Sequence, residues 1–269
     1  MDQIIGMSER KKTILSSVLL LAIFLGAWQL SVKSPTPGVK AGLPGPVAVG
    51  TRAWEMISNP FYDNGPNDKG IGIQLGYSIG RLAVGYTAAA LVAIFAGVML
   101  GLSPGLYRAL NPYIQVLKPI SPLAWMPLFL YTIKDSTQSA IMVIFMSSLW
   151  PILANTAFGV AGIKRDYLNV SALLQLSWFK RLWTVVLPAA APAIVAGLRI
   201  SIGSAWVAIV AAEMLIGGVG IGFFIWDSWN SSRISDIILA LLYVGLVGFV
   251  LDRLVAWVGR LVTRGTSAG

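Results

Sequence analysis

The 269-residue sequence contains no histidine and no cysteine, and only 12% of its residues are charged. Without these two side chains, the chain lacks the commonest zinc ligands, the base of Ser-His and Cys-His catalytic sites, and the thiols of disulfides. Soluble domains carry roughly 25% charged residues, whereas this chain is 56% apolar with a mean hydropathy of +0.75. A soluble fold has no interior large enough for so much apolar surface, so lipid is expected to surround much of the chain.

Six apolar segments follow one another along the chain. A hydrocarbon core of about 30 Å takes roughly 20 helical residues at 1.5 Å each, which is close to the length of each segment. The segments cover residues 13–30, 82–102, 110–133, 136–163, 189–215 and 237–258. They predict an all-α polytopic membrane protein with about six transmembrane helices.

The first span begins like a secretory signal peptide, because Arg10, Lys11 and Lys12 precede its apolar run. The run is long, however, and no small-residue cleavage site follows it, so we expect a retained helix. The second span contains the spacing Gly97-x-x-x-Gly101. This spacing allows a close contact between helices, although chance in a glycine-rich helix explains it equally well.

The third span is interrupted by Pro119, Pro122 and Pro127. Helix breaks at membrane depth are tolerated only where protein or a water-filled cavity satisfies the freed backbone groups. A helix that merely anchored a soluble enzyme would have no need of such breaks. The prolines therefore favour a transport protein over an anchor.

Lysine and arginine collect on one side of the predicted spans, and this excess places that side in the cytoplasm. The twelve on the inner side are Arg10, Lys11, Lys12, Arg108, Lys164, Arg165, Lys180, Arg181, Arg199, Arg253, Arg260 and Arg264. The six on the outer side are Lys33, Lys40, Arg52, Lys69, Lys134 and Arg233. This orientation predicts a cytoplasmic amino terminus (1–12), a single transmembrane domain (13–258) and a cytoplasmic tail (259–269). Within the domain, loop 31–75 is extracytoplasmic and loop 164–188 is cytoplasmic.

Loop 164–188 is amphipathic. Its apolar side consists of Tyr167, Val170, Leu173 or Leu174, Phe179 and Leu182, and its polar side of Asn169, Gln175, Lys180 and Arg181. Periodicity leaves two interpretations equally open. The segment either lies on the inner leaflet, held by tryptophans and cations, or docks a soluble cytoplasmic partner.

The same loop resembles the cytoplasmic signature loop of ATP-binding-cassette (ABC) importer permeases. That loop reads Glu-Ala-Ala, three residues, Gly, and then Leu-Pro thirteen residues after the Gly. Here Leu187 and Pro188 match, and "AAAPAIVAGLR" follows them. Gln175 occupies the position of the Gly and Asn169 that of the Glu, while Val170 and Ser171 replace the alanines. The chain departs from the family pattern at those positions.

Two further stretches place the resemblance within one subgroup of these permeases. "LKPISPLAWMPL" (residues 117–128) is similar to the "RPIPPLAWIPL" of permeases for nitrate, bicarbonate, cyanate, sulfonates and taurine, and "LPGPVAVG" is similar to their "LPSP" segment. Residues 210–248 resemble the cyanobacterial nitrate and bicarbonate permeases. The resemblance covers nearly the whole chain from Leu43 onward and implies the type I ABC importer permease fold.

The resemblance also implies partners and a location. It implies a second permease subunit that we expect to be a copy of this chain, two cytoplasmic ATPase subunits and an extracytoplasmic substrate-binding protein. The expected location is the inner membrane of a bacterium, and specifically of a cyanobacterium. We expect no cofactor in this chain, because the G-x-x-x-x-G-K-[ST] phosphate loop is absent from the sequence. ATP and Mg would be bound by the ATPase subunits, and "GGVGIG" (217–222) is interpreted as a flexible turn. Nucleic acid is not an expected partner.

The resemblance makes residues 166–183 the coupling helix, which seats on the ATPase. Its candidate contact residues are Asp166, Asn169, Gln175, Phe179, Lys180, Arg181 and Trp183. Candidates for the translocation path are Arg81, Lys118, Trp125, Met126 and Glu213, because charges and helix breaks within membrane segments are functional by default. The alternatives are a structural ion pair between Arg81 and Glu213, snorkelling of Lys118, and a dimer-interface role for Trp125 and Met126.

These features predict the permease subunit of an ATP-driven importer for a small inorganic anion, with nitrate or nitrite as the first candidate. Bicarbonate is the close alternative, followed by sulfonate, taurine or cyanate. A stand-alone secondary transporter or channel is the alternative from a different class. Such proteins usually show internal repeats or more helices.

Overall fold

The computed structural model describes residues 9–32 and 43–263 of the chain. Within these two ranges every regular element is a helix, apart from one isolated bridge between Asp63 and Lys69. Parts of three predicted segments lie outside the described residues. These parts are residues 1–8 of the amino terminus, 33–42 of the outer loop and 264–269 of the tail. The prediction of an all-α fold is confirmed for the described chain.

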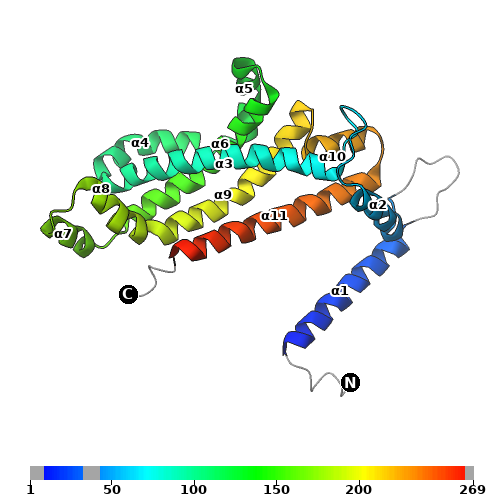
Figure 1. Cartoon of the computed structure of the whole chain (residues 1–269), viewed down its shortest axis with the longest axis horizontal. Coiled ribbons are helices and arrows are strands. Elements are labelled where there is room, and N and C mark those ends of the chain that lie inside the picture. Colours follow the sequence, from blue (N-terminus) through cyan, green and yellow to red (C-terminus); the bar gives the residue numbers. More distant parts are fainter. Residues whose placement is uncertain (1–8, 33–42, 264–269) are drawn as a thin grey trace.

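Five helices of the described chain are long and apolar enough to cross a membrane. They are α1 (Glu9–Ser31), α3 (Ile71–Leu102), α6 (Ser136–Ala161), α9 (Leu187–Ile216) and α11 (Ile234–Thr263) (Figure 1). A bent pair, Pro104–Leu117 with Pro122–Ile133, brings the number to six if it is taken as one span. The predicted number of about six is confirmed.

The bent pair is the third predicted span, and it contains the break that its prolines predict. Helix α4 (Pro104–Leu117) is followed by a 3-10 turn, η1 (Pro122–Trp125), and by α5 (Met126–Ile133), with a bend of 85°. Proline lacks the N–H that continues a helix and disfavours helical geometry in the residue before it. As a result, α5 projects sideways from the bundle (Figure 1). The helix also begins at Pro104, earlier than the predicted 110.

Helices α3, α6 and α9 form the centre of the bundle. The side chains of Ala89 and Ala93 on α3 are fully buried, and an added Cβ at Gly97 or Gly101 would come within 2.6 Å of Thr156 or Val160 on α6. The two glycines of the Gly97-x-x-x-Gly101 spacing therefore allow a close contact between α3 and α6 within one subunit. Helix α3 begins at Ile71, so the segment predicted as a loop to residue 75 is too long by one helical turn.

The remaining short helices lie at the two ends of the bundle (Figure 1). One end carries α2 (Pro46–Ser58) and α10 (Ile221–Asn230). The opposite end carries α7 (Arg165–Leu173), α8 (Trp178–Arg181) and a five-residue π-helix, η2 (Leu182–Val186), which runs into α9. Helix α1 stands apart from the bundle, and none of the residues in its most apolar stretch is buried against the rest of the described chain.

Candidate functional site

The segment from α7 to η2 exposes a group of large apolar side chains at one end of the molecule. Leu173 is 82% exposed, Phe179 65% and Trp183 59%. The rings of Phe179 and Trp183 lie one helical turn apart, with centroids 6.1 Å from each other. Ser177 caps α8, since its Oγ accepts a hydrogen bond from the backbone N–H of Lys180. The cap fixes the start of α8, which carries Phe179, and η2, which carries Trp183, follows it directly.

Most of the predicted coupling residues share this exposed region. Asp166, Asn169, Gln175 and Lys180 are exposed, as are Phe179 and Trp183. Arg181 differs, because it is half-buried and its Nε has no hydrogen-bond partner within the described chain. With Leu102 and Trp178 it lines a cavity of about 190 Å³ between α8 and the end of α3. Six of the seven predicted residues are thus exposed, whereas Arg181 is partly buried.

Gln175 ends α7 in the left-handed backbone conformation, with φ at 50°. The N–H of Leu176 bonds to the carbonyl of Ser171, and the N–H of Gln175 bonds to that of Ala172. This pair of bonds is the Schellman arrangement, in which the left-handed residue is usually glycine. The position that carries Gly in the family pattern therefore has glycine geometry here, although its residue is Gln. The match of the loop to the family signature has a physical basis at this position.

Arg81 and Glu213 form a buried ion pair between α3 and α9. The Nη1 of Arg81 lies 2.8 Å from Oε1 of Glu213, whose side chain is completely buried. Ser78 donates its hydroxyl to the same carboxylate, and the N–H of Gly222 bonds to Oε2 at 3.1 Å. Arg81 Nη1 also donates to the carbonyl oxygen of Val219. The ion pair offered as an alternative by the sequence is present, whereas a role of either residue in the path stays a prediction.

The glycine-rich run 217–222 folds over this ion pair. The N–H of Gly220 bonds to Oε1 of Gln74 at 2.7 Å, and the N–H of Ile221 bonds to Oγ of Ser78 at 2.9 Å. A Cβ at Gly220 would collide with the carboxyl group of Glu213. Close approach of backbone to carboxylate is thus the reason for glycine here. The run forms a turn, as predicted, but it is held by buried side chains and so is not the free, flexible turn that we expected.

The other predicted path residues lie apart from this ion pair. Lys118 is exposed at the carboxyl end of α4. Trp125 is half-buried, and its ring stacks on Phe129 with centroids 6.2 Å apart. Met126 is 2% exposed and packs inside the subunit. The structure therefore does not gather the five candidates into one site.

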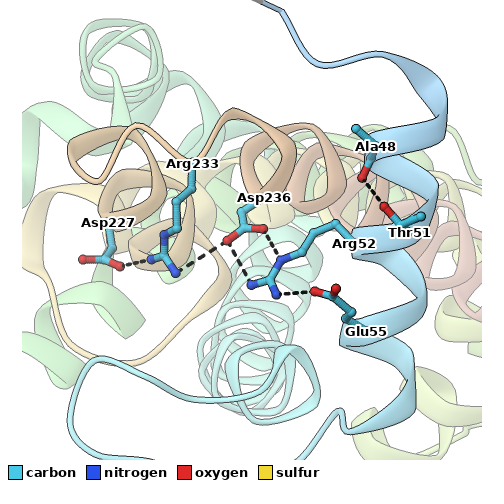
Figure 2. A network of polar contacts seen from close by, with 7 residues as sticks. All are labelled: Ala48, Thr51, Arg52, Glu55, Asp227, Arg233 and Asp236. Atoms are coloured by element: carbon cyan, nitrogen blue, oxygen red, sulfur yellow. Dashed lines mark hydrogen bonds and ion pairs between the residues drawn. The ribbon is translucent and has the colours of Figure 1, made fainter. Parts of the chain in front are cut away.

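A charged network ties α2 to the start of α11 at the end of the molecule opposite α7 (Figure 2). Asp236, whose side chain is 3% exposed, accepts hydrogen bonds from Nε and Nη2 of Arg52 at 2.7 and 3.2 Å. Arg233 bridges Asp227 and the same carboxylate, and Glu55 contacts Arg52 from α2 itself. The hydrogen bond to Asp236 raises the pKa of Arg52 above its already high ordinary value.

Sequence reasoning missed Gln74, Ser78 and the Arg52–Asp236 pair. A signal for the first two was present, because Gln74, Ser78 and Arg81 occupy positions i, i+4 and i+7 of one helix. Polar residues at that spacing share one face and indicate a buried polar partner on a neighbouring helix. Nothing comparable marks Arg52 and Asp236, which are 184 residues apart in the sequence.

Comparisons with known proteins agree with this geometry. The family described as binding-protein-dependent transport system inner membrane component matches residues 71–264. The chain is 49% identical to the nitrate import permease protein NrtB of Synechocystis sp., over 93% of this chain and 89% of that one. It is 46% identical to the bicarbonate transport system permease protein CmpB of Synechococcus elongatus, over 90% and 86%.

Among solved structures, an inward-facing form of the MetNI methionine ABC transporter superposes with a TM-score of 0.59 at 16% identity, covering 71% of this chain and 94% of that one. At that identity the likeness shows the fold alone, and it confirms the expected type I importer permease fold. The resemblance seen in the signature loop and in residues 117–128 is confirmed by the family match. The chain belongs to the family of binding-protein-dependent transport system inner membrane components.

Proposed function

We propose that this chain is the membrane-embedded permease subunit of an ATP-driven importer that carries nitrate or nitrite. The observation that carries the proposal is the 49% identity with a nitrate import permease along 93% of the chain. The structure supports the permease role, because a broken span and an exposed, aromatic-rich segment accompany the long apolar helices.

Bicarbonate is the second candidate cargo. The bicarbonate permease CmpB is 46% identical over 90% of the chain, close to the value for the nitrate relative. Nitrate and bicarbonate are both small, planar, singly charged oxyanions, so one set of hydrogen-bond donors serves either. A transport measurement on the assembled complex is therefore needed to decide between the two cargoes.

The assembly that fits this role contains two copies of the chain, two cytoplasmic ATPase subunits and an extracytoplasmic binding protein. ATP and Mg²⁺ are then bound by the ATPase subunits, since the sequence of this chain has no phosphate loop. The excess of lysine and arginine on the α7 side supports an orientation with both termini and α7 in the cytoplasm. The Arg52–Asp236 network then lies on the outer side.

Coupling to the ATPase is assigned to the segment from α7 to η2. Phe179 and Trp183 are its apolar anchors, because buried aromatic residues carry much of the energy of protein interfaces. Movement of the ATPases on nucleotide binding would be transmitted through η2 to α9, into which it runs without a break. The permease then alternates between outward- and inward-open states whose populations the nucleotide sets.

The docking step is tested by retention of ATPase subunits on the purified permease. The variant carries Phe179→Ala with Trp183→Ala, and its control is Trp54→Ala, which removes a 73% exposed aromatic ring from α2 at the opposite end. We expect the first variant to lose the ATPase while remaining folded in the membrane, and the control to retain it. Retention by both variants would show that residues 178–183 form an interfacial membrane helix.

The cargo is tested by uptake into proteoliposomes that hold the whole complex and its binding protein. We expect ATP-dependent accumulation of labelled nitrate, competed by nitrite. Accumulation of labelled bicarbonate without nitrate would assign the second cargo. Uptake that needs neither ATP nor the binding protein would point to a stand-alone transporter.

A further inference from the structure

The polar residues of α4 lie on one face of the helix. Arg108, Asn111, Gln115 and Lys118 occupy positions i, i+3, i+7 and i+10, which a helix brings to the same side. The opposite side carries Leu106, Leu110, Tyr113 and Val116, all exposed and apolar. Helix α4 is therefore strongly amphipathic, although it forms half of a candidate membrane span.

The polar face of α4 borders a cavity of about 450 Å³ between α3, α4 and α6. All four polar residues line it. The facing wall consists of small and apolar residues of α6, among them Ala154, Ala157 and Ala161, with Trp150 and Phe158 beside them. Because alanine side chains are small, they leave space for a ligand of several atoms beside the polar groups.

The cavity has a positive charge. Arg108 and Lys118 are its two ionised groups, and none of the residues that line it is an aspartate or glutamate. Among described residues neither cation forms an ion pair, and the one hydrogen bond of the Arg108 side chain runs from Nε to the carbonyl of Pro104. Asn111 and Gln115 add amide N–H donors between the two cations. Such a set of donors fits an anion.

The position of the cavity links it to the proposed coupling end. Helix α4 starts directly after α3, beside α8, and runs from there to the bend at Lys118 (Figure 1). Two cations without acidic partners in a membrane span are costly unless they face water or a ligand. A break in the helix at the same point is tolerated for the same reason.

We propose that the polar face of α4, formed by Arg108, Asn111, Gln115 and Lys118, lines the inner half of the translocation path and binds a small oxyanion there. This inference rests on the proposed function, since it takes the cargo to be an anion. The cations attract the anion into the cavity, and the amides replace part of its hydration shell. The bend above Lys118 separates this half from the outer half of the molecule.

The test uses the natural absence of cysteine from the chain. Single variants Asn111→Cys and Gln115→Cys are placed in the complete complex, in inside-out vesicles. Each is treated with an anionic or a cationic methanethiosulfonate reagent, with and without nitrate, and labelling of this chain is read by mass spectrometry. The matched controls are Tyr113→Cys and Val116→Cys, on the apolar face of the same helix.

We expect both polar-face variants to react, and the anionic reagent to react about tenfold faster than the cationic one, because a cavity of one charge concentrates ions of the other. Nitrate should slow the reaction, and removing the charges with Arg108→Gln and Lys118→Gln should abolish the preference for the anionic reagent. The two controls should stay unlabelled. Unreactive polar-face variants, or labelling that is indifferent to reagent charge and to anions, would overturn the proposal.

The result separates this proposal from the assignment of the cargo. If wild type carries no nitrate but bicarbonate slows the labelling of Gln115→Cys, the path stands and the nitrate assignment fails. If wild type accumulates nitrate and the polar-face variants remain unlabelled, the nitrate assignment stands and the path lies elsewhere. Transport by Arg260→Gln, which removes an exposed cation from α11, should remain close to wild type.

Discussion

Arg81 Nη1 lies 2.8 Å from Oε1 of Glu213, and this contact joins α3 to α9 beneath the turn at 217–222. The same carboxylate accepts from Ser78 and from the backbone of Gly222. The carboxylate of Glu213 therefore has partners on both α3 and the segment that follows the turn. The pair orders this end of the bundle, because the turn, α3 and α9 cannot separate without leaving a buried charge unpaired.

Glu213→Gln should destabilise the protein severely. The substitution keeps the size of the side chain but leaves the guanidinium of Arg81 buried without its counter-charge, which typically costs about 3–5 kcal/mol. The thermal unfolding midpoint in lipid nanodiscs is the measurement. The control is Glu55→Gln, because Glu55 pairs with Arg52 in an exposed setting, where a pair contributes about 0–1 kcal/mol.

Arg81→Met combined with Glu213→Gln should recover part of the loss, since no unpaired charge is then buried. A single Glu213→Gln variant as stable as the Glu55→Gln control would contradict the assigned role. So would a double variant that is less stable than Glu213→Gln alone.

The spans and their number were predictable from the sequence, because lipid imposes long apolar runs that few other environments demand. The start of α3 at Ile71 was not predictable from the sequence. The first turns of α3 include Gln74 and Ser78, which are polar but buried against the turn at 217–222. Their low hydropathy is typical of a loop. Their place in a helix is explained only by their hydrogen bonds to the backbone of Gly220 and Ile221.

The candidate site was predictable where a residue carries its own signal. Phe179 lies on the apolar side that the amphipathic spacing predicts, whereas Trp183 was singled out only through the resemblance of its loop to the family signature; both side chains are exposed. The pair of Arg81 and Glu213 follows from two charges at similar depth. The direction of α5 and the Arg52–Asp236 contact depend on packing between distant parts of the chain, for which the sequence has no periodic pattern.

Gln175→Gly should stabilise the end of α7. Gln175 has a φ of 50°, a conformation that costs a residue with a Cβ roughly 1 kcal/mol more than glycine. Hydrogen exchange of the α7 amides in the assembled complex should slow by a few-fold. Asn169→Gly is the matched control, because it places glycine inside the same helix, where it costs about 0.5–1 kcal/mol. Faster exchange in Gln175→Gly would show that its side chain has a contact worth more than the backbone strain.

Gly101→Ala should separate α3 from α6. The added methyl group would lie 2.6 Å from Cβ of Val160 and 2.8 Å from the carbonyl oxygen of Ala157, and this backbone atom cannot move aside alone. Overpacking of this kind costs about 1–3 kcal/mol. Gly80→Ala, on the same helix with nothing within 4 Å, is the control and should be neutral or slightly stabilising, since alanine favours helix over glycine by about 0.5–1 kcal/mol. Thermal unfolding of the two variants side by side measures the difference, and equal midpoints would mean that α3 and α6 do not approach as closely as the small residues allow.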